Sequence, residues 1–188
     1  MVAKMRKGER REQLLAVAGS IIDTGGVDAL TLGRLAEQAG ITKPVVYDHF
    51  ASRSALLVAL YRELDAQQTE KLKRYLGDAE ASLHGQAAAI ARAHVECVVE
   101  HGRDVAGILG ALEGSPALEK LKHETEGSYL ESCRNALSVF ARGGKVSTAT
   151  MTAILGAAEA LSQAASRQSL LPEDAITELT RIIVLTTT

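Results

Sequence analysis

The segment from Thr31 to Phe50 constrains the fold of this 188-residue chain more than any other stretch. It reads TLGRLAEQAGITKPVVYDHF, and its apolar side chains recur at helical spacing on both sides of Gly40. A threonine precedes each half, Thr31 before the first and Thr42 before the second, where a hydroxyl can accept a hydrogen bond from the first turn of a helix. The sequence therefore predicts two short helices joined by a tight turn.

The remainder of the chain is predicted to be helical as well. No stretch shows the sustained alternation of apolar and polar residues that is typical of a strand. Each of the three prolines falls where a helix would begin, a position at which its missing N–H costs nothing. Glycines separate the longer apolar patterns, which predict helices over residues 7–24, 52–75, 79–101, 103–112, 115–142, 146–168 and 172–186. The predicted fold class is therefore all-α.

The composition excludes several other classes of protein. Apolar residues make up 46% of the chain and charged residues 23%, which is enough apolar material to build a core. No apolar run approaches the ~20 residues that span a bilayer, and the charged N-terminus lacks the apolar region of a signal peptide. Cys97 and Cys133 are expected to be free thiols, as in a reducing compartment. We therefore expect a cytoplasmic protein with no membrane partner.

The two short helices have the spacing of a helix-turn-helix, in which the second helix enters the major groove of DNA. If Val46 and Phe50 face the core, the side chains around them lie on or beside the outward face. The net charge of the whole chain is only −2, but residues 1–11 carry five basic side chains against the single acid Glu9. A basic arm of this kind can follow the DNA backbone or enter the minor groove.

The stretch from about Arg10 to Leu57 resembles the DNA-binding domain of TetR/AcrR-family transcriptional regulators. The residues that carry the resemblance follow the pattern Thr31-x-x-x-Leu35-Ala36-x-x-Ala39-Gly40-Ile41-Thr42-x-x-x-Val46-Tyr47-x-His49-Phe50-x-Ser52-Arg53-x-x-Leu56-Leu57. The resemblance implies an N-terminal three-helix helix-turn-helix DNA-binding unit, residues 1–51. It also implies that this unit is fused to a larger helical bundle for ligand binding and dimerisation, residues 52–188.

The resemblance also implies roles for individual residues. The implied DNA-binding residues are Thr31, Thr42, Lys43, Pro44, Val45, Tyr47, His49 and Arg53. Of these, Lys43, Pro44 and Val45 would meet base edges, whereas Thr31, Tyr47, His49 and Arg53 would contact the phosphate backbone. Gly33 stands where many members carry a long polar side chain that reads a base. We therefore expect base reading to depend on Lys43 and the basic arm.

The last two helices predict a homodimer. The 146–168 segment combines a stripe of small residues with a stripe of larger apolar residues, and a helix that is apolar on two faces is buried on both. The expected dimer-interface residues are Ala153, Gly156, Ala157, Ala160, Ala164, Ile176, Leu179 and Ile183. A two-fold dimer would read two half-sites on one face of double-stranded DNA.

The middle helices are expected to hold a cavity for a small molecule. The expected ligand-binding residues are Tyr61, His94, Cys97, His101 and Tyr129. Because His94, Cys97 and His101 share one helix face, an alternative is that they ligate zinc or copper. The sequence contains no catalytic motif and no phosphate-binding glycine loop, so neither enzyme activity nor a cofactor is expected.

The predicted function is sequence-specific regulation of transcription. We expect a repressor that a small-molecule effector releases from a palindromic operator. Two alternatives remain open from the sequence. One is a metal-responsive regulator or helical-bundle metal-binding protein that uses His94, Cys97 and His101. The other is an architectural or partner-binding protein without an effector.

Overall fold

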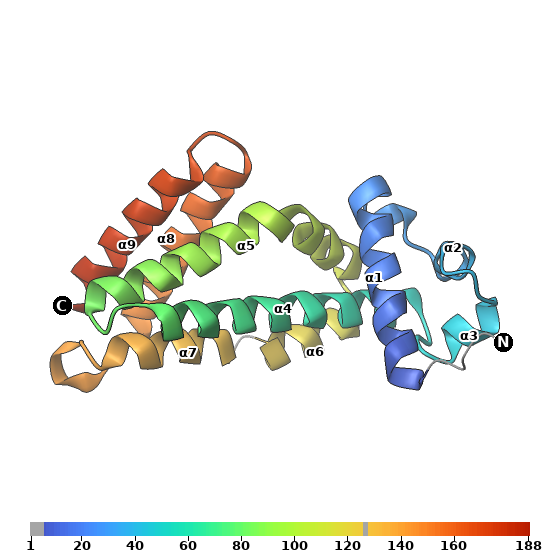
Figure 1. The fold of residues 1–188 in the computed structure, drawn as a ribbon, viewed down its shortest axis with the longest axis horizontal. Helices are drawn as coiled ribbons and strands as arrows, with labels where there is room; N and C mark the ends of the chain where they lie inside the picture. The colour runs from blue at the N-terminus through green and yellow to red at the C-terminus, as the bar shows by residue number, and fades with distance from the viewer. Residues whose placement is uncertain (1–5, 126–127) are drawn as a thin grey trace. The chain divides into compact units, whose positions relative to one another are not determined.

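A computed structural model describes residues 6–125 and 128–188 of the chain. These residues contain helices and no strand (Figure 1), which confirms the all-α prediction. The α-helices are α1 Lys7–Gly25, α2 Leu32–Gln38, α3 Lys43–Tyr47, α4 Arg53–Asp78, α5 Leu83–Leu112, α6 Pro116–Thr125, α7 Ser128–Ser138, α8 Thr148–Ser166 and α9 Pro172–Thr187. Two 3₁₀ helices lie between α1 and α2 and between α7 and α8, η1 Val27–Ala29 and η2 Arg142–Gly144. Among the described helices, none combines the length and the hydropathy that a bilayer-spanning helix requires.

Helix α5 differs from the sequence prediction because Gly102 does not end it. The two helices predicted over 79–101 and 103–112 form one continuous helix. A glycine inside a helix costs about 1 kcal/mol relative to alanine. Burial of a leucine or isoleucine side chain stabilises by about 1.5–3 kcal/mol, and Ile108 and Leu112 are both buried beyond the glycine. Packing of the end of α5 therefore outweighs the weak helix propensity of Gly102.

The helix predicted over 115–142 is described in two parts. α6 ends at Thr125 and α7 begins at Ser128, and residues 126–127 lie outside the described part of the chain. α7 ends at Ser138, earlier than predicted. Gly143 and Gly144 have φ angles of 74° and 70°, a left-handed conformation that favours glycine. They form the turn that leads to α8.

The chain forms two compact units. The first comprises Met1–Leu64 and Arg103–Lys122, and the second comprises Asp65–Gly102 and His123–Thr188. Each unit has its own cluster of buried apolar side chains. α4 and α5 each contribute residues to both units.

The core of the first unit is built by α1 and the helix-turn-helix. Leu14, Ala18 and Ile21 repeat at the i, i+4 and i+7 positions of α1, and all three are fully buried. Val46 of α3 and Phe50, just beyond its end, belong to the same cluster. The apolar faces of α1 and α3 thus pack into one core, as their spacing predicts.

The second unit is built around the pair formed by α8 and α9, which lie side by side (Figure 1). Ala175, Leu179 and Ile183 of α9 are fully buried. They share one apolar cluster with Ile154 and Ala158 of α8. The stripe of larger apolar residues on α8 therefore faces the interior of this unit.

Candidate nucleic-acid interface and ligand cavity

The turn between α2 and α3 is fixed by local hydrogen bonds. The Thr31 hydroxyl accepts a hydrogen bond from the Arg34 N–H at 3.1 Å and so caps α2. Gly40 adopts a φ of 66°, which glycine takes without strain. The Ile41 N–H then donates to the Ala36 carbonyl at 3.0 Å and closes the turn.

The start of α3 depends on Pro44. The Thr42 hydroxyl accepts no hydrogen bond from the first turn of α3, contrary to the capping role that the sequence predicts. Pro44 lies in that first turn, where its fixed φ suits a helix and its missing N–H is not needed. Thr42 is exposed beside it.

Helix α3 has one buried and one exposed face. Val46 is completely buried, whereas 55% of the neighbouring Tyr47 is exposed to solvent. The other side chains predicted to lie on or beside the outward face are exposed or half-buried: Lys43, Pro44, Val45 and His49. α3 thus presents polar and small apolar side chains outward, while its larger apolar face is packed.

The Lys43 side chain lies against Gly33 of α2. A Cβ atom placed on Gly33 would be 3.4 Å from Lys43 Cε and 3.8 Å from Lys43 Nζ. A longer side chain at position 33 would compete with Lys43 for this space. The missing side chain of Gly33 therefore gives Lys43 room at the junction of α2 and α3.

Arg11 of α1 holds the end of the helix-turn-helix. Its guanidinium lies 4.6 Å from the centre of the Phe50 ring, and its Nη1 donates to the His49 carbonyl at 3.2 Å. Partial burial lowers the pKa of the His49 imidazole, and the positive charges of Lys7 and Arg11 lower it further. The basic side chains at the start of α1 thus lie close to His49. The sequence identified Arg11 only as part of a basic arm; residues 1–5 of that arm lie outside the described part of the chain.

Arg53, predicted to anchor a phosphate, binds the backbone of the first unit. Its Nε donates to the Leu30 carbonyl and its Nη2 to the Val27 carbonyl, each at 2.7 Å. The same Nη2 lies 3.7 Å from a carboxylate oxygen of Asp28. Arg53 therefore connects the start of α4 to the η1 turn, just before the Thr31 cap of α2.

Replacing Arg53 with methionine is expected to destabilise the first unit by about 1–3 kcal/mol, because two carbonyls lose charge-assisted hydrogen bonds. Chemical denaturation followed by circular dichroism measures the change. Arg142→Met, an exposed arginine of the second unit, is the matched control and should change stability by less than ~0.5 kcal/mol. Unchanged stability of the Arg53 variant would show that these hydrogen bonds make no net contribution to the free energy of unfolding.

The second unit contains a cavity of about 20 Å³, room for about one water molecule. Side chains from α5, α7, α8 and α9 line it, and most are isoleucine, leucine, methionine and alanine. The polar exceptions are His94, Tyr129 and Cys133. The centres of the His94 and Tyr129 rings lie 6.3 Å apart. The Tyr129 hydroxyl is buried and lacks a hydrogen bond of adequate geometry.

All three polar side chains of the cavity are uncharged at neutral pH. Burial lowers the pKa of the His94 imidazole to about 4. Burial also raises the pKa of the Cys133 thiol to about 12 and that of the Tyr129 hydroxyl well above its usual value. The cavity is thus a neutral, largely apolar environment.

Only two of the five predicted ligand-binding residues line this cavity, His94 and Tyr129. Tyr61 packs against the core of the first unit instead. Cys97 is half-buried outside the cavity lining, and His101 lies 3.8 Å from a carboxylate oxygen of Glu100. The predicted face extends over two turns of α5, and the cavity meets only the end that carries His94.

The alternative metal site is not supported. Within the described residues, no group of three or more His, Cys, Asp or Glu side chains is placed to hold a metal ion. His94 and His101 are seven residues apart on one helix, which separates them by roughly 10 Å along its axis. Metal–nitrogen bonds of about 2 Å require ligands that converge on one point.

The residues predicted to form a dimer interface divide into two sets. The small residues of α8, together with Ile176 of α9, are exposed or half-buried: Ala153, Gly156, Ala157, Ala160, Ala164 and Ile176. Leu179 and Ile183 are instead fully buried inside the second unit. They offer no surface to a partner, because the apolar face of α9 packs within its own chain. The interface prediction is corrected at these two positions.

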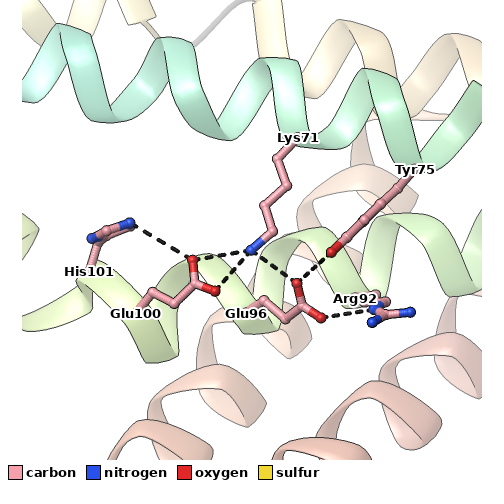
Figure 2. Close-up of polar contacts among 6 residues, drawn as sticks. All are labelled: Lys71, Tyr75, Arg92, Glu96, Glu100 and His101. Carbon is pink, nitrogen blue, oxygen red and sulfur yellow. Dashed lines mark hydrogen bonds and ion pairs between the residues drawn. The ribbon is translucent and has the colours of Figure 1, made fainter.

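A polar network joins α4 to α5 within the second unit (Figure 2). The Lys71 ammonium lies 2.9 Å from a carboxylate oxygen of Glu96 and 3.1 Å from both carboxylate oxygens of Glu100. The Tyr75 hydroxyl and the Arg92 Nε donate to Glu96 at 2.7 and 2.8 Å. Burial alone would raise the pKa of Glu96, but the hydrogen bonds from Arg92, Tyr75 and Lys71 lower it to about 2. Glu96 therefore stays ionised at neutral pH.

Residues 14–60 match a family model described as bacterial regulatory proteins, tetR family. The match begins at the first buried leucine of α1 and includes the whole helix-turn-helix and the start of α4. The DNA-binding segment of the chain is thus similar to that of the tetR family. The resemblance found in the sequence is thereby confirmed.

Two curated relatives match the chain over part of their length. The HTH-type transcriptional activator FasR of Mycolicibacterium smegmatis is 38% identical over 63 residues, which cover 33% of this chain and 29% of FasR. The Tetracycline repressor protein class C of Escherichia coli is 33% identical over 113 residues, 59% of this chain and 49% of the repressor. The chain thus spans less than half the length of either relative.

A solved structure extends the similarity of fold to almost the whole chain. A transcriptional regulator of the TetR/AcrR family from Thermobifida fusca superposes with a TM-score of 0.69 at 19% identity. The superposition covers 93% of this chain and 96% of that one. At this identity the similarity shows the shared fold.

Proposed function

We propose that this chain is a sequence-specific DNA-binding transcriptional regulator of the TetR family. The observation that carries the proposal is the division of α3, in which Val46 is buried while Tyr47 and Lys43 are exposed. A helix with one packed and one exposed face can enter a major groove without disturbing its own core. The residues proposed to contact DNA are those that the sequence predicts, from Thr31 to Arg53.

Positive charge near the end of α3 supports this proposal. Lys7 and Arg11 lie close enough to His49 to lower its pKa. The same charges attract the phosphate backbone of DNA. Arg53 has a second role in this proposal, because it also fixes the turn that precedes α2.

The regulator is proposed to act as a homodimer on a palindromic operator. Ala153, Gly156 and Ala160 form an exposed row on α8. Small residues let two helices approach closely, so this face suits contact with a second copy. A two-fold dimer presents two copies of α3 to two half-sites.

We further propose repression that a small molecule relieves. One of the two relatives is named as an activator and the other as a repressor; we propose a repressor for this chain. The cavity beside His94 supports an effector. α4 and α5 each have residues in both units. A ligand that moves either helix in the second unit can therefore change the position of residues of the same helix in the first unit.

The test is a mobility shift and a footprint on the DNA upstream of the protein's own gene. Lys43→Ala is expected to reduce affinity for the preferred site by roughly 5-fold to 150-fold and to relax base preference, since a base contact is worth about 1–3 kcal/mol. Tyr47→Phe is expected to weaken all sites alike, by about fivefold, because one phosphate hydrogen bond is lost.

The matched control is Lys145→Ala, an exposed lysine of the second unit, which should leave affinity unchanged. A footprint whose protected DNA sequence lacks two-fold symmetry would contradict binding of a dimer to a palindromic operator. Equal affinities for the parent protein, Lys43→Ala and Tyr47→Phe would contradict the proposed docking of α3.

A further inference from the structure

The Tyr129 hydroxyl is the least satisfied polar group of the cavity. It is buried and has no hydrogen bond of adequate geometry, although Cys133 and Gln68 are its polar neighbours. A buried hydroxyl without a partner is costly, and native structures retain few of them. This hydroxyl therefore has an unused donor beside a cavity.

The rest of the lining determines which ligands the cavity can accept. Among the side chains that the structure describes, no lysine, arginine, aspartate or glutamate lines it. His94 and Cys133 are both held in their uncharged forms by burial. A carboxylate, phosphate or ammonium group would therefore enter the cavity without a countercharge, which is strongly unfavourable.

We propose that the cavity binds an uncharged ligand with an aliphatic body and one oxygen head group, an alcohol or a ketone, that accepts a hydrogen bond from the Tyr129 hydroxyl. His94 provides a second, neutral hydrogen-bonding partner for the same oxygen. The aliphatic body packs among Ile154, Leu155 and Met151. This inference rests on the proposed function, since the ligand is the effector of the regulator.

Entry of such a ligand requires the cavity to widen. Its present volume is about 20 Å³, whereas pockets for small molecules measure about 300–1,000 Å³. The ligand must therefore select a more open arrangement of the helices around the cavity, and its apparent affinity falls by the fraction of protein in that state. Binding thereby changes the packing of α5, whose residues belong to both units.

The experiment measures how tightly the protein binds three probes of equal chain length near neutral pH. The probes are 1-hexanol, hexanoate and hexylammonium. Calorimetry and the shift of the thermal unfolding midpoint measure binding. We expect 1-hexanol to bind at least about tenfold more tightly than either ion. Tyr129→Phe should weaken 1-hexanol binding about fivefold to tenfold while raising the midpoint of the unliganded protein.

Tyr75→Phe is the matched control, because the Tyr75 hydroxyl donates to Glu96 and lies outside the cavity lining. It should leave the affinity for 1-hexanol unchanged. Equal binding of hexanoate or hexylammonium, or an unchanged affinity after Tyr129→Phe, would overturn the inference. Absence of 1-hexanol binding would overturn it as well. A mobility shift on the same preparation then separates the two proposals, since protein that binds operator DNA but no alcohol leaves the regulator standing.

Discussion

Phe50→Ala is expected to destabilise the first unit by about 3–5 kcal/mol and to abolish operator binding. Phe50 is 1% exposed and packs in the same cluster as Val46, Leu14 and Leu35. Truncating a buried phenylalanine removes its transfer free energy and leaves a cavity. The loss is a large fraction of the ~5–15 kcal/mol by which typical domains are stable. Denaturant unfolding and a mobility shift measure the two effects.

Two controls identify the cause. Tyr47→Ala changes an exposed aromatic of the same segment, so it should leave stability within about 0.5 kcal/mol while reducing DNA affinity. Phe140→Ala changes a half-buried phenylalanine of the second unit and should leave DNA binding intact. A Phe50 variant that unfolds like the parent and still binds its operator would contradict the placement of α3.

The second large effect is a loss of stability in mild acid through His94. Burial lowers the folded-state pKa of His94 to about 4, against an ordinary value of 6.5. Above about pH 6.5 the imidazole is neutral in both states, so it makes no pH-dependent contribution. Between about pH 6.5 and 4 the His94 imidazole is protonated in the unfolded chain but remains neutral in the folded chain. Stability therefore falls as the pH falls, by about 2–3 kcal/mol over the full interval.

Comparison with His94→Gln isolates this effect, because glutamine does not titrate. As the pH drops from neutral to about 4.5, the unfolding free energy of the parent should fall more than that of the variant. His84→Gln, which changes an exposed histidine on the same helix, is the matched control for the substitution itself. A pH-independent difference between the parent and His94→Gln would show that His94 is solvated.

The helix-turn-helix could be predicted from the sequence because its signals are local. Thr31, Gly40 and Pro44 act on the turns next to them, and the spacing of Val46 and Phe50 fixes the buried face of α3. Each of these effects extends over four residues or fewer. The structure shows the buried and exposed faces that this spacing requires.

The bundle was less predictable because its arrangement depends on contacts between distant segments. Helical spacing on α9 indicates an apolar face, but it does not say whether that face packs within the chain or against a second copy. Leu179 and Ile183 pack within the chain. Similarly, His94, Cys97 and His101 share a face of α5, yet of these three only His94 lines the cavity. Local propensity also could not show that packing carries α5 through Gly102.

The role of Arg53 was missed for the same reason. Its hydrogen-bond acceptors, the carbonyls of Leu30 and Val27, precede it by more than twenty residues. The pattern of side chains in a sequence does not indicate which backbone carbonyl, more than twenty residues away, will accept a hydrogen bond. The network of Lys71, Glu96 and Glu100 likewise joins two helices whose pairing the sequence does not specify.

The placement of Lys71 between two carboxylates has a mechanical consequence. Glu96 and Glu100 are successive acceptors on one side of α5, about 6 Å apart along its axis. If this part of α4 slides along α5, the ammonium, which now pairs with both carboxylates, loses one of them and keeps the other. Pulling the two helices apart would break both pairs at once. The ion pairs therefore resist separation of the two helices more strongly than they resist a shift of one helix along the axis of the other.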